Sequence, residues 1–408
     1  MKRAYEPLLL ELLVEFPCVG LFGPRQCGKT TLLQSLPEGW RRYDLERGAD
    51  LQAVTNDPDL FFRLNPGRVA IDECQVVPEL FPALRVAIDD RRQERGRFVI
   101  TGSSSPYLMR SISESLAGRI AVIEMAPLSW SEVSAHDDPS LAALICDRSV
   151  EPADVVTSLK PRGTVRQAHE YWFWGGYPEP WLRGSERFRS RWQEQYVHTY
   201  LERDVAQLFP GLDRNRFRLF LRLLGGLSGR VLNYSEVARS LGVSQPTVRD
   251  YFDIAHGTFI WRRLPSFEHD VCKRVVKHPK GYLRDSGLLH HLLRIPDLDA
   301  LLAHPQAGTS WEGMVIEELL RQLSALGVSF EPFFYRTAGG AEVDCVLEGN
   351  FGLVPVEVKY GSAVDRRELR PLRDFMSEHG CRLGVVVNND TVPRLLEERV
   401  LGVPFSWL

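Results

Sequence analysis

The sequence contains no long apolar run. Of its 408 residues 44% are hydrophobic and 25% are charged, but no stretch approaches the roughly 20 consecutive apolar residues that a membrane-spanning helix needs. The first residues lead into Leu8-Leu9-Leu10, but Glu11 and Glu15 interrupt the apolar core that a signal peptide would require. We therefore predict a soluble, cytoplasmic protein without a membrane partner.

Cysteine motifs and an excess of one charge are also missing. The seven cysteines, at positions 18, 27, 74, 146, 272, 345 and 381, show no CxxC or CxxH spacing. This pattern excludes a disulfide framework and a zinc module, and it fits a reducing compartment. The 50 Lys and Arg nearly balance the 53 Asp and Glu, leaving a net charge of −3. Any surface that binds nucleic acid must therefore be a local patch, because the chain as a whole carries no positive charge excess.

The clearest motif is a glycine-rich loop between an apolar strand and a helix. Residues 23–30 have the form G-x-x-x-x-G-K-T. In such loops backbone N–H groups surround a phosphate, the lysine reaches the β- and γ-phosphates, and the hydroxyl ligates Mg²⁺. ATP and Mg²⁺ are the cofactors we expect, with Lys29 and Thr30 in these two roles. The expected nucleotide-binding residues are Gly23, Pro24, Arg25, Gln26, Cys27, Gly28, Lys29, Thr30 and Thr31.

Two acids follow a second apolar strand. The strand at residues 68–71 leads directly into Asp72 and Glu73. Asp72 is expected to hold Mg²⁺ through water, and Glu73 to polarise the attacking water, because open α/β sheets carry their ligand chemistry at the carboxyl ends of strands.

A third strand ends in hydroxyl groups. Residues 97–102 lead to Ser103, which we predict to sense the γ-phosphate, with Thr101 as the alternative. The pattern of residues 79–90 predicts a crossover helix between the second and third strands. Alternating strands and helices predict an α/β domain with a doubly wound parallel sheet.

The middle of the chain contains a helix-turn-helix pattern at residues 233–252. Gly242 permits the tight turn and Ser244 can cap the second helix. Residues 234–284 hold nine Lys and Arg against five Asp and Glu, and strands that resemble a wing follow the helices. A module used only for packing is the alternative to DNA binding. The residues expected to contact DNA are Gln245, Thr247, Arg249, Arg262 and Arg263.

The C-terminal part combines an amphipathic helix at residues 311–320 with a probable hairpin. Side chains two apart in a strand share a face, so Glu357 and Lys359 point the same way. Asp344 lies in the partner strand, and Glu312 approaches from the helix. Two or three carboxylates beside a lysine can hold Mg²⁺ and orient water for attack on a phosphodiester. An amphipathic hairpin with a charged solvent face is the alternative.

Taken together, these segments resemble bacterial and archaeal AAA-type ATPases that continue into a winged-helix segment and a restriction-endonuclease-like, PD-(D/E)XK domain. The motifs that carry this resemblance lie at residues 23–30, 70–73, 101–104, 115–119, 127–129, 175–178 and 200–204, and at Asp344, Glu357 and Lys359. The resemblance implies a homo-oligomer and a role for Arg119 at the nucleotide or the next subunit, with a surface cation as the alternative. It also implies Asp344 and Glu357 as metal ligands. The catalytic residues that it implies are Glu312, Asp344, Glu357 and Lys359, with Glu312 as the helical acid that holds a metal-bound water.

The resulting prediction is an ATP-hydrolysing protein that remodels or processes DNA. Its expected parts are an AAA-type P-loop domain at 1–150, a helical connector at 151–228, a winged helix at 229–300 and a restriction-endonuclease-like α/β domain at 301–408. The alternative function is a nucleotide-gated signalling or regulatory switch that cuts nothing.

Overall fold

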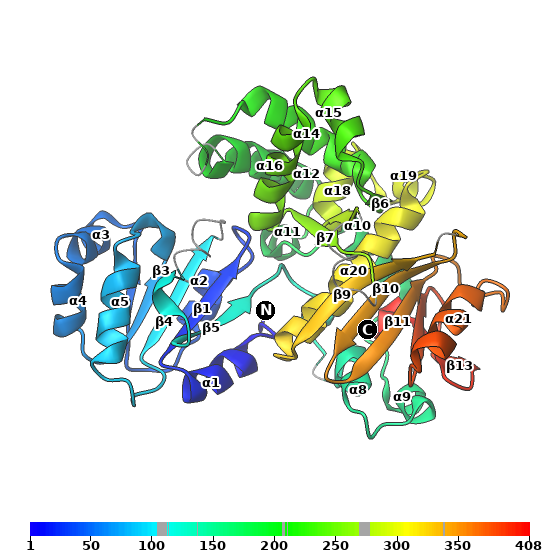
Figure 1. Cartoon of the computed structure of the whole chain (residues 1–408), viewed down its shortest axis with the longest axis horizontal. Coiled ribbons are helices and arrows are strands. Elements are labelled where there is room, and N and C mark those ends of the chain that lie inside the picture. Colours follow the sequence, from blue (N-terminus) through cyan, green and yellow to red (C-terminus); the bar gives the residue numbers. More distant parts are fainter. Residues whose placement is uncertain are drawn as a thin grey trace. The chain divides into compact units, whose positions relative to one another are not determined.

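The computed structural model describes residues 1–103, 112, 114–136, 138–205, 209, 211–268, 278–337 and 339–408 (Figure 1). These residues form two compact units. One comprises residues 2–127 with 257–259, and the other comprises Met1, 128–256 and 260–408. Among the helices of the described residues, none has both the length and the apolar character needed to span a bilayer.

The first unit is built on a five-stranded sheet with the order β2-β3-β4-β1-β5, and every pair in it is parallel. This confirms the predicted parallel α/β sheet. Its strands are β1 (Cys18–Gly23), β2 (Trp40–Asp44), β3 (Arg68–Asp72), β4 (Phe98–Ser103) and β5 (Ile120–Glu124). The helices named for this unit are α1 (Glu6–Glu15), α2 (Lys29–Gln34), α3 (Gly48–Thr55), α4 (Pro58–Leu64), α5 (Leu80–Asp89) and the 3₁₀ turn η1 (Cys74–Val76).

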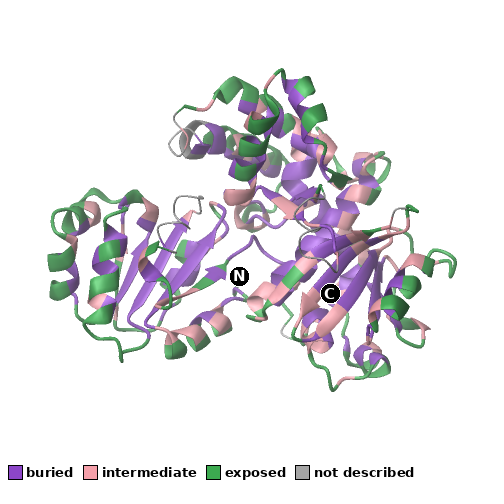
Figure 2. Ribbon diagram, in the orientation of Figure 1, coloured by how far each residue is buried: buried purple, intermediate pink, exposed green. Residues whose placement is uncertain are grey.

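Both faces of this sheet are covered. In β3, Val69 and Ile71 lie in a cluster with residues of α4 and α5, while Ala70, which points to the opposite face, is also fully buried. Neighbouring Val99 of β4 repeats this pattern. Continuous apolar strands of this kind are typical of parallel sheets between helices, and Figure 2 shows these strands as buried ribbons beside helices that carry exposed residues.

The second unit begins with helices and then forms a small antiparallel sheet of three strands, ordered β6-β8-β7. The predicted helix-turn-helix corresponds to α15 (Tyr234–Leu241) and α16 (Gln245–Gly257), and the strands are β6 (Arg230–Val231), β7 (Trp261–Leu264) and β8 (Lys280–Leu283). The preceding helices are α7 (Trp130–Ser134), α8 (Leu141–Cys146), α9 (Pro152–Ser158), α10 (Val165–Trp174), α11 (Pro178–Arg183), α12 (Glu186–Thr199), the π-helix η2 (Tyr200–Val205) and α14 (Arg214–Leu227).

The C-terminal part of this unit is a mixed sheet of six strands, ordered β13-β14-β12-β11-β10-β9. β9, β10 and β11 form an antiparallel meander, and β12 and β14 add in parallel. The strands are β9 (Phe330–Arg336), β10 (Glu342–Gly349), β11 (Gly352–Val358), β12 (Gly384–Asn388), β13 (Arg394–Glu397) and β14 (Val400–Pro404). The accompanying helices are α18 (Ser286–Leu292), α19 (Leu298–Leu302), α20 (Ala307–Ala325), α21 (Arg370–His379) and the 3₁₀ turn η3 (Phe405–Trp407).

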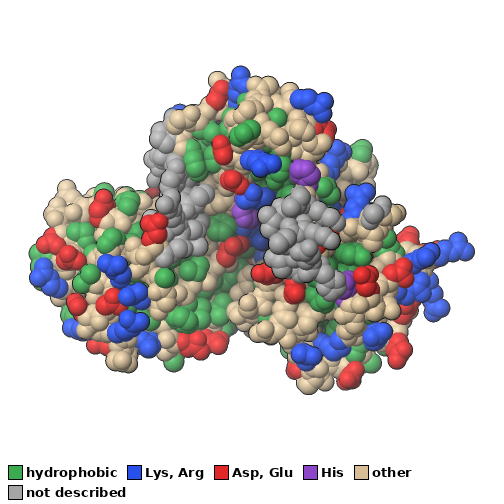
Figure 3. All heavy atoms as spheres, in the orientation of Figure 1, with side chains coloured by type: hydrophobic (Ala, Val, Ile, Leu, Met, Phe, Trp, Pro, Cys, Tyr) green, Lys and Arg blue, Asp and Glu red, His purple; other side chains and the backbone are tan. Residues whose placement is uncertain are grey.

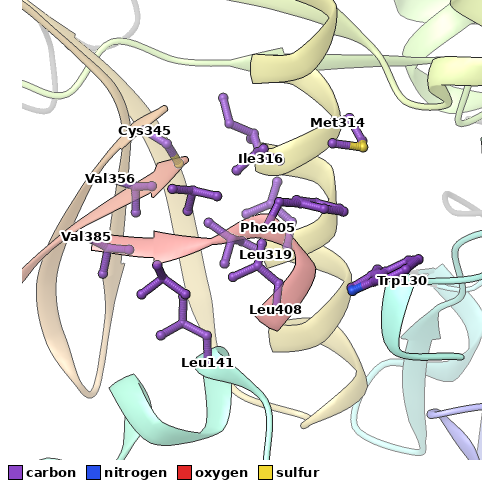
Figure 4. Packing of buried hydrophobic residues seen from close by; sticks show 14 of the residues in the cluster. Trp130, Leu141, Met314, Ile316, Leu319, Cys345, Val356, Val385, Phe405 and Leu408 are labelled. Atoms are coloured by element: carbon purple, nitrogen blue, oxygen red, sulfur yellow. The ribbon is translucent and has the colours of Figure 1, made fainter. Parts of the chain in front are cut away.

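One hydrophobic core joins the early helices of this unit to the C-terminal sheet. Figure 4 shows Trp130 of α7 and Leu141 of α8 around the same cluster as Leu319 of α20, Val385 of β12 and Phe405. The compact unit with the glycine-rich loop therefore ends at residue 127, before the expected boundary at 150. The expected boundaries at 228 and 300 both lie inside the second unit.

Candidate functional site

The glycine-rich loop lies between β1 and α2, as the sequence predicts. The Lys29 ammonium donates to the carbonyl oxygens of Gly23 (3.1 Å) and Pro24 (2.8 Å). Gln26 and Gly28 both have left-handed backbone conformations, with φ of 57° and 100°. A left-handed Gln is uncommon and marks a constrained loop. Among the other loop residues predicted to bind nucleotide, Cys27 is buried, Arg25 is half-buried and Thr31 is exposed.

Two glycines in this loop leave no room for a side chain. A Cβ on Gly23 would lie 2.0 Å from the carbonyl oxygen of Met125, and one on Gly28 would lie 2.9 Å from Arg3 Nη1. Arg3 is itself buried and donates to the carbonyl oxygen of Ala126 at 2.7 Å. The loop therefore packs closely against the backbone of Met125, which follows β5, and against the Arg3 side chain.

A hydroxyl, a carboxylate and a second hydroxyl meet beside the loop. Thr30 Oγ1 donates to Asp72 Oδ2 at 2.6 Å. Thr101, fully buried on β4, donates to the other oxygen of Asp72. Ser103, the preferred residue of the sequence prediction, has its Oγ buried without a hydrogen-bond partner among the described residues. The two candidate hydroxyls thus differ, because Thr101 orients Asp72 whereas the Ser103 hydroxyl bonds none of the residues that the structure describes.

Glu73 follows β3 in a strained conformation. Its φ of 57° places a non-glycine residue in the left-handed region, which is uncommon and often occurs at functional sites. Its amide donates to Asp72 Oδ1 at 3.2 Å, and Gln75 Nε2 donates to its carboxylate. The backbone of Glu73 is thus held beside Asp72, and its carboxylate is held by Gln75.

Two predicted arginines of this unit are paired. Arg25 bonds Glu46 at 3.2 Å. Arg119 makes a two-pronged ion pair with Asp89 at the end of α5, with both N···O distances 2.8 Å. The arginine–carboxylate hydrogen bonds lower the pKa of Asp89 and raise that of Arg119. Any contact between Arg119 and a nucleotide or another subunit would require this ion pair to open.

These groups fit ATP and Mg²⁺. The Thr30 hydroxyl and the Asp72 carboxylate are oxygen donors of the type that Mg²⁺ prefers, and they already lie at hydrogen-bonding distance. The tight glycine loop and the Lys29 ammonium supply the phosphate cradle.

The helix-turn-helix presents part of its predicted DNA surface. On α16, Gln245 and Arg249 are exposed and Thr247 is half-buried. The Arg249 guanidinium lies 5.5 Å from the ring centre of Tyr234, and Thr247 Oγ1 lies 2.8 Å from Ser244 Oγ. Three residues that contributed to the predicted basic excess, Lys273, Arg274 and Lys277, lie outside the described residues.

Arg262 and Arg263 on β7 differ sharply. Arg263 bonds Asp253 at 2.6 Å on the surface. Arg262 instead forms an ion pair with Glu317 of α20, whose carboxylate also lies 3.4 Å from Arg284 Nε. Glu317 is buried, and although burial raises its pKa, the two arginines outweigh that effect and lower it. Arg262 therefore belongs to an interior ion pair and not to the surface that we predicted to contact DNA.

The hairpin of β10 and β11 brings three predicted residues together. Its register pairs Cys345 with Val356, which sets Asp344 beside Glu357. Lys359 Nζ lies 3.0 Å from Glu357 Oε1, and Glu357 Oε2 is buried with no hydrogen-bond partner among the residues that the structure describes.

Glu312 lies on α20, as predicted, and it is also paired with two residues of β8. Its carboxylate accepts hydrogen bonds from Lys280 Nζ, at 2.7 Å, and from the Tyr282 hydroxyl, both on β8. Lys280 also bonds Glu342 at 2.6 Å. Glu312 is thus paired with a lysine that the sequence analysis counted only as part of a basic excess.

Burial and crowding shape the charges of this acidic cluster, which we define as Glu312, Glu342, Asp344 and Glu357. Burial raises the pKa of Asp344 well above its ordinary value, and the neighbouring carboxylates raise it further. Burial also raises the pKa of Glu357, although Lys359 opposes it. Burial lowers the pKa of Lys280, but the surrounding carboxylates outweigh this effect, so that pKa is raised.

The fit of this cluster to a metal ion is partial. Within the described ranges, no group of three or more His, Cys, Asp or Glu side chains is placed to hold one. Asp344 and Glu357 remain as two carboxylates, the number that protein Mg²⁺ sites often use together with retained waters.

Four residues at these sites were missed by the sequence analysis: Arg3, Lys280, Tyr282 and Glu342. Spacing alone could not reveal them, because each reaches its partner from a distant segment. The alternation of Lys280 and Tyr282 in a short strand was the available signal.

Comparison with known families divides the chain into three parts. A model described as an AAA domain matches residues 15–134. Two models of domains of unknown function, DUF8612 and DUF4143, match residues 165–299 and 307–408. With the parallel sheet and the glycine-rich loop, the first match defines the N-terminal unit as an AAA-type P-loop ATPase domain.

Relatives extend over most of the chain. Uncharacterized protein Rv2008c of Mycobacterium tuberculosis is 36% identical over 336 residues, which cover 81% of this chain and 68% of the relative. The chain belongs to the same family as this mycobacterial protein. Uncharacterized protein MJ1544 of Methanocaldococcus jannaschii is 22% identical over 300 residues, covering 71% of this chain and 62% of the relative.

Among solved structures, the chain is similar to the Walker-type ATPase PABY2304 of Pyrococcus abyssi. The match has a TM-score of 0.41 and 16% identity, and it covers 72% of this chain and 95% of that one. A STAND protein with a tetratricopeptide-repeat sensor from Pyrococcus horikoshii has a TM-score of 0.28 and 13% identity, covering 80% and 47%. The assignment rests on the AAA domain and the mycobacterial relative, not on these structures.

Proposed function

We propose that the protein hydrolyses ATP at the glycine-rich loop and that its second unit binds duplex DNA through α16. The main support for ATP hydrolysis is that the hydroxyls of Thr30 and Thr101 both donate to the Asp72 carboxylate, next to the glycine-rich loop. The AAA domain match supports it.

Each residue of the proposed ATPase site has a separate role in hydrolysis. Lys29 attracts the β- and γ-phosphates, and the loop amides hold them in place. Thr101 fixes the orientation of Asp72, so that this carboxylate and Thr30 can hold Mg²⁺, which supplies charge neutralisation at the phosphates. Glu73, which follows β3 directly, polarises the attacking water. Ser103 offers its unused hydroxyl to the γ-phosphate.

DNA binding is proposed from the surface of α16. Gln245 and Arg249 are exposed on the second helix of a helix-turn-helix, the element that enters the major groove in such modules. Arg263 lies at the surface on the wing strand β7 and can exchange Asp253 for a phosphate. Charges of both signs are mixed over the visible face in Figure 3, so the proposed contact is a local one.

One experiment tests both halves. ATP turnover is measured without DNA and with linear duplex, single-stranded and junction DNA, together with DNA binding at several salt concentrations. We expect turnover in every case and duplex binding that weakens steeply with salt, because phosphate contacts release counterions. Turnover without any salt-dependent DNA binding would instead favour the nucleotide-gated regulatory switch.

A second candidate function is metal-dependent cleavage of DNA. The unpartnered Glu357 Oε2 supports it, since Asp344 and Glu357 could then share a divalent cation while Lys359 stabilises the phosphate. Mn²⁺-dependent nicking is compared between the wild type and Asp344→Ala with Glu357→Ala. Nicking only in the wild type supports this function, whereas equal nicking or none in both contradicts it.

We also propose that the protein is a cytoplasmic homo-oligomer. This proposal follows from the resemblance to AAA-type ATPases, which the AAA domain match supports for residues 15–134. Light scattering with and without ATP measures the subunit number, and a monomer under both conditions would contradict this proposal.

A further inference from the structure

We propose that Lys280 is the resident cation of the acidic cluster and that its ammonium lowers the affinity of Asp344 and Glu357 for divalent cations. The lysine comes from β8 of the small antiparallel sheet, whereas the carboxylates come from α20, β10 and β11. This role of Lys280 rests on the cation site at Asp344 and Glu357 proposed above, and it does not depend on ATP hydrolysis or DNA binding.

The first step is the position of Lys280. Its side chain is 6% exposed, and its ammonium lies 2.7 Å from Glu312 Oε1 and 2.6 Å from Glu342 Oε1. The Tyr282 hydroxyl donates to the same oxygen of Glu312. Two carboxylates that could otherwise turn toward a metal ion are thus held by one buried ammonium.

The second step is why β8 comes so close. Gly313 of α20 faces Tyr282, and a Cβ there would lie 2.9 Å from the Tyr282 ring. On β8 itself, Gly281 packs against Trp261, where a Cβ would lie 2.2 Å from the indole. Two glycines therefore allow α20, β8 and β7 to pack closely. This packing puts Lys280 within reach of Glu312.

The third step is electrostatic. The four carboxylates of the acidic cluster face two ammonium groups, because Lys359 bonds Glu357 while Lys280 bonds the other pair. Lys280 also lies close enough to Asp344 to stabilise negative charge there. The positive charge of the Lys280 ammonium would oppose the binding of a divalent cation at Asp344 and Glu357, and such repulsion is strong where water is excluded. It would also find Glu312 and Glu342 already occupied.

The test is Mn²⁺ binding to the nucleotide-free protein, followed by electron paramagnetic resonance, for the wild type, Lys280→Met and Lys280→Arg. Lys280→Met keeps much of the side-chain volume and removes the charge, while Lys280→Arg keeps the charge. We expect at least about tenfold tighter Mn²⁺ binding in Lys280→Met only. Mn²⁺ should also raise the unfolding midpoint of that variant, because an ion that binds the folded state stabilises it.

Further variants locate the ion. Adding Asp344→Asn and Glu357→Gln to Lys280→Met should remove the gained affinity. If Lys280→Met does not fold, Lys280→Met with Glu342→Gln, which removes one charge of each sign, is measured in its place. Equal Mn²⁺ affinity in the wild type and the folded variant, whether both bind or neither does, would overturn the proposal and leave Lys280 as a structural ion pair.

Discussion

Thr30 Oγ1 lies 2.6 Å from Asp72 Oδ2, and this hydrogen bond connects the first turn of α2 to the carboxyl end of β3. It joins a hydroxyl and a carboxylate, which are oxygen donors of the type that Mg²⁺ prefers. Because Thr101 holds the other oxygen of Asp72, the carboxylate is oriented from both sides, and catalysis benefits when such groups are fixed before the substrate arrives.

Lys29→Ala should abolish ATP turnover. The substitution removes the ammonium that we propose attracts the β- and γ-phosphates, and we expect a loss of at least about 100-fold in kcat/KM. Steady-state phosphate release measures it. Lys160→Ala, a change of an exposed lysine in the second unit, serves as the control, and turnover at the wild-type rate in Lys29→Ala would place the ATPase site elsewhere.

Glu73→Gln should separate binding from hydrolysis. The amide keeps the size of the side chain but cannot polarise water, so ATP should remain bound while single-turnover hydrolysis slows by about 100-fold or more. Binding of a fluorescent ATP analogue and single-turnover hydrolysis are measured on the same preparation. Loss of nucleotide binding would show that Glu73 has a structural role at its strained position.

Thr101→Val and Ser103→Ala distinguish the two hydroxyls on β4. Thr101→Val removes a buried hydrogen bond to Asp72, so it should weaken the Mg²⁺ dependence of turnover as well as the rate. Ser103→Ala removes a hydroxyl that bonds no described residue, so it should slow hydrolysis at an unchanged Mg²⁺ requirement. A Mg²⁺ titration of kcat for both variants checks this, and identical titration curves would contradict the distinction.

Arg249→Ala should weaken DNA binding, whereas Arg262→Ala should lower the stability of the fold. The exposed Arg249 is expected to contact a phosphate, so its loss should weaken DNA binding and reduce the salt slope by about one, with no change in stability. Arg262→Ala should cost about 3 kcal/mol of unfolding free energy, because it leaves the buried Glu317 with a single arginine. Denaturant unfolding and DNA titrations measure both, and an unfolding free energy unchanged in Arg262→Ala would contradict the assignment.

His290 should make the second unit sensitive to acid. Its Nδ1 lies 3.2 Å from the Phe173 carbonyl oxygen and its Nε2 lies 2.7 Å from Ser310 Oγ. Burial lowers its pKa to about 3, whereas an unfolded histidine titrates near 6.5. The unfolded chain therefore binds the extra proton first, so stability should fall as pH decreases from about 6.5 towards 3.

The comparison for this prediction is His290→Gln, with His198→Gln at an exposed position as the control. The wild type and His198→Gln should lose on the order of a few kcal/mol more than His290→Gln over this pH range. Unfolding by denaturant between pH 7 and pH 4 measures the difference. Parallel pH profiles for all three proteins would mean that His290 is not the titrating group.

The ATPase site was predictable because its chemistry is local in the sequence. The glycine-rich loop spans residues 23–30, and Asp72 and Glu73 end a recognisable strand, so parallel strand order alone brings them together. The choice between Ser103 and Thr101 was not predictable, since it depends on which hydroxyl faces Asp72. The Glu357 and Lys359 pairing followed from strand alternation.

The environment of the acidic cluster could not be predicted in the same way. Glu312 was placed on the correct helix, but its partners Lys280 and Tyr282 depend on how β8 packs against α20. Arg262 was predicted to contact DNA because its local sequence gives no sign of its ion pair with the buried Glu317, which lies in a distant segment. Buried ion pairs between distant segments follow from tertiary packing and carry no periodic signal.

The contacts between α20 and the small sheet have a practical consequence for dissecting the chain. A fragment starting at residue 301 would retain the buried Glu317 and Glu318 but lose Arg262, Arg284 and the Tyr171 hydroxyl that satisfy them. It would also lose Lys280, and Glu312 would then lack the ammonium that bonds it. Buried carboxylates stripped of their partners destabilise a fold by several kcal/mol each. The natural place to cut is therefore near residue 127, and a shorter C-terminal fragment should aggregate rather than report on the domain it was meant to isolate.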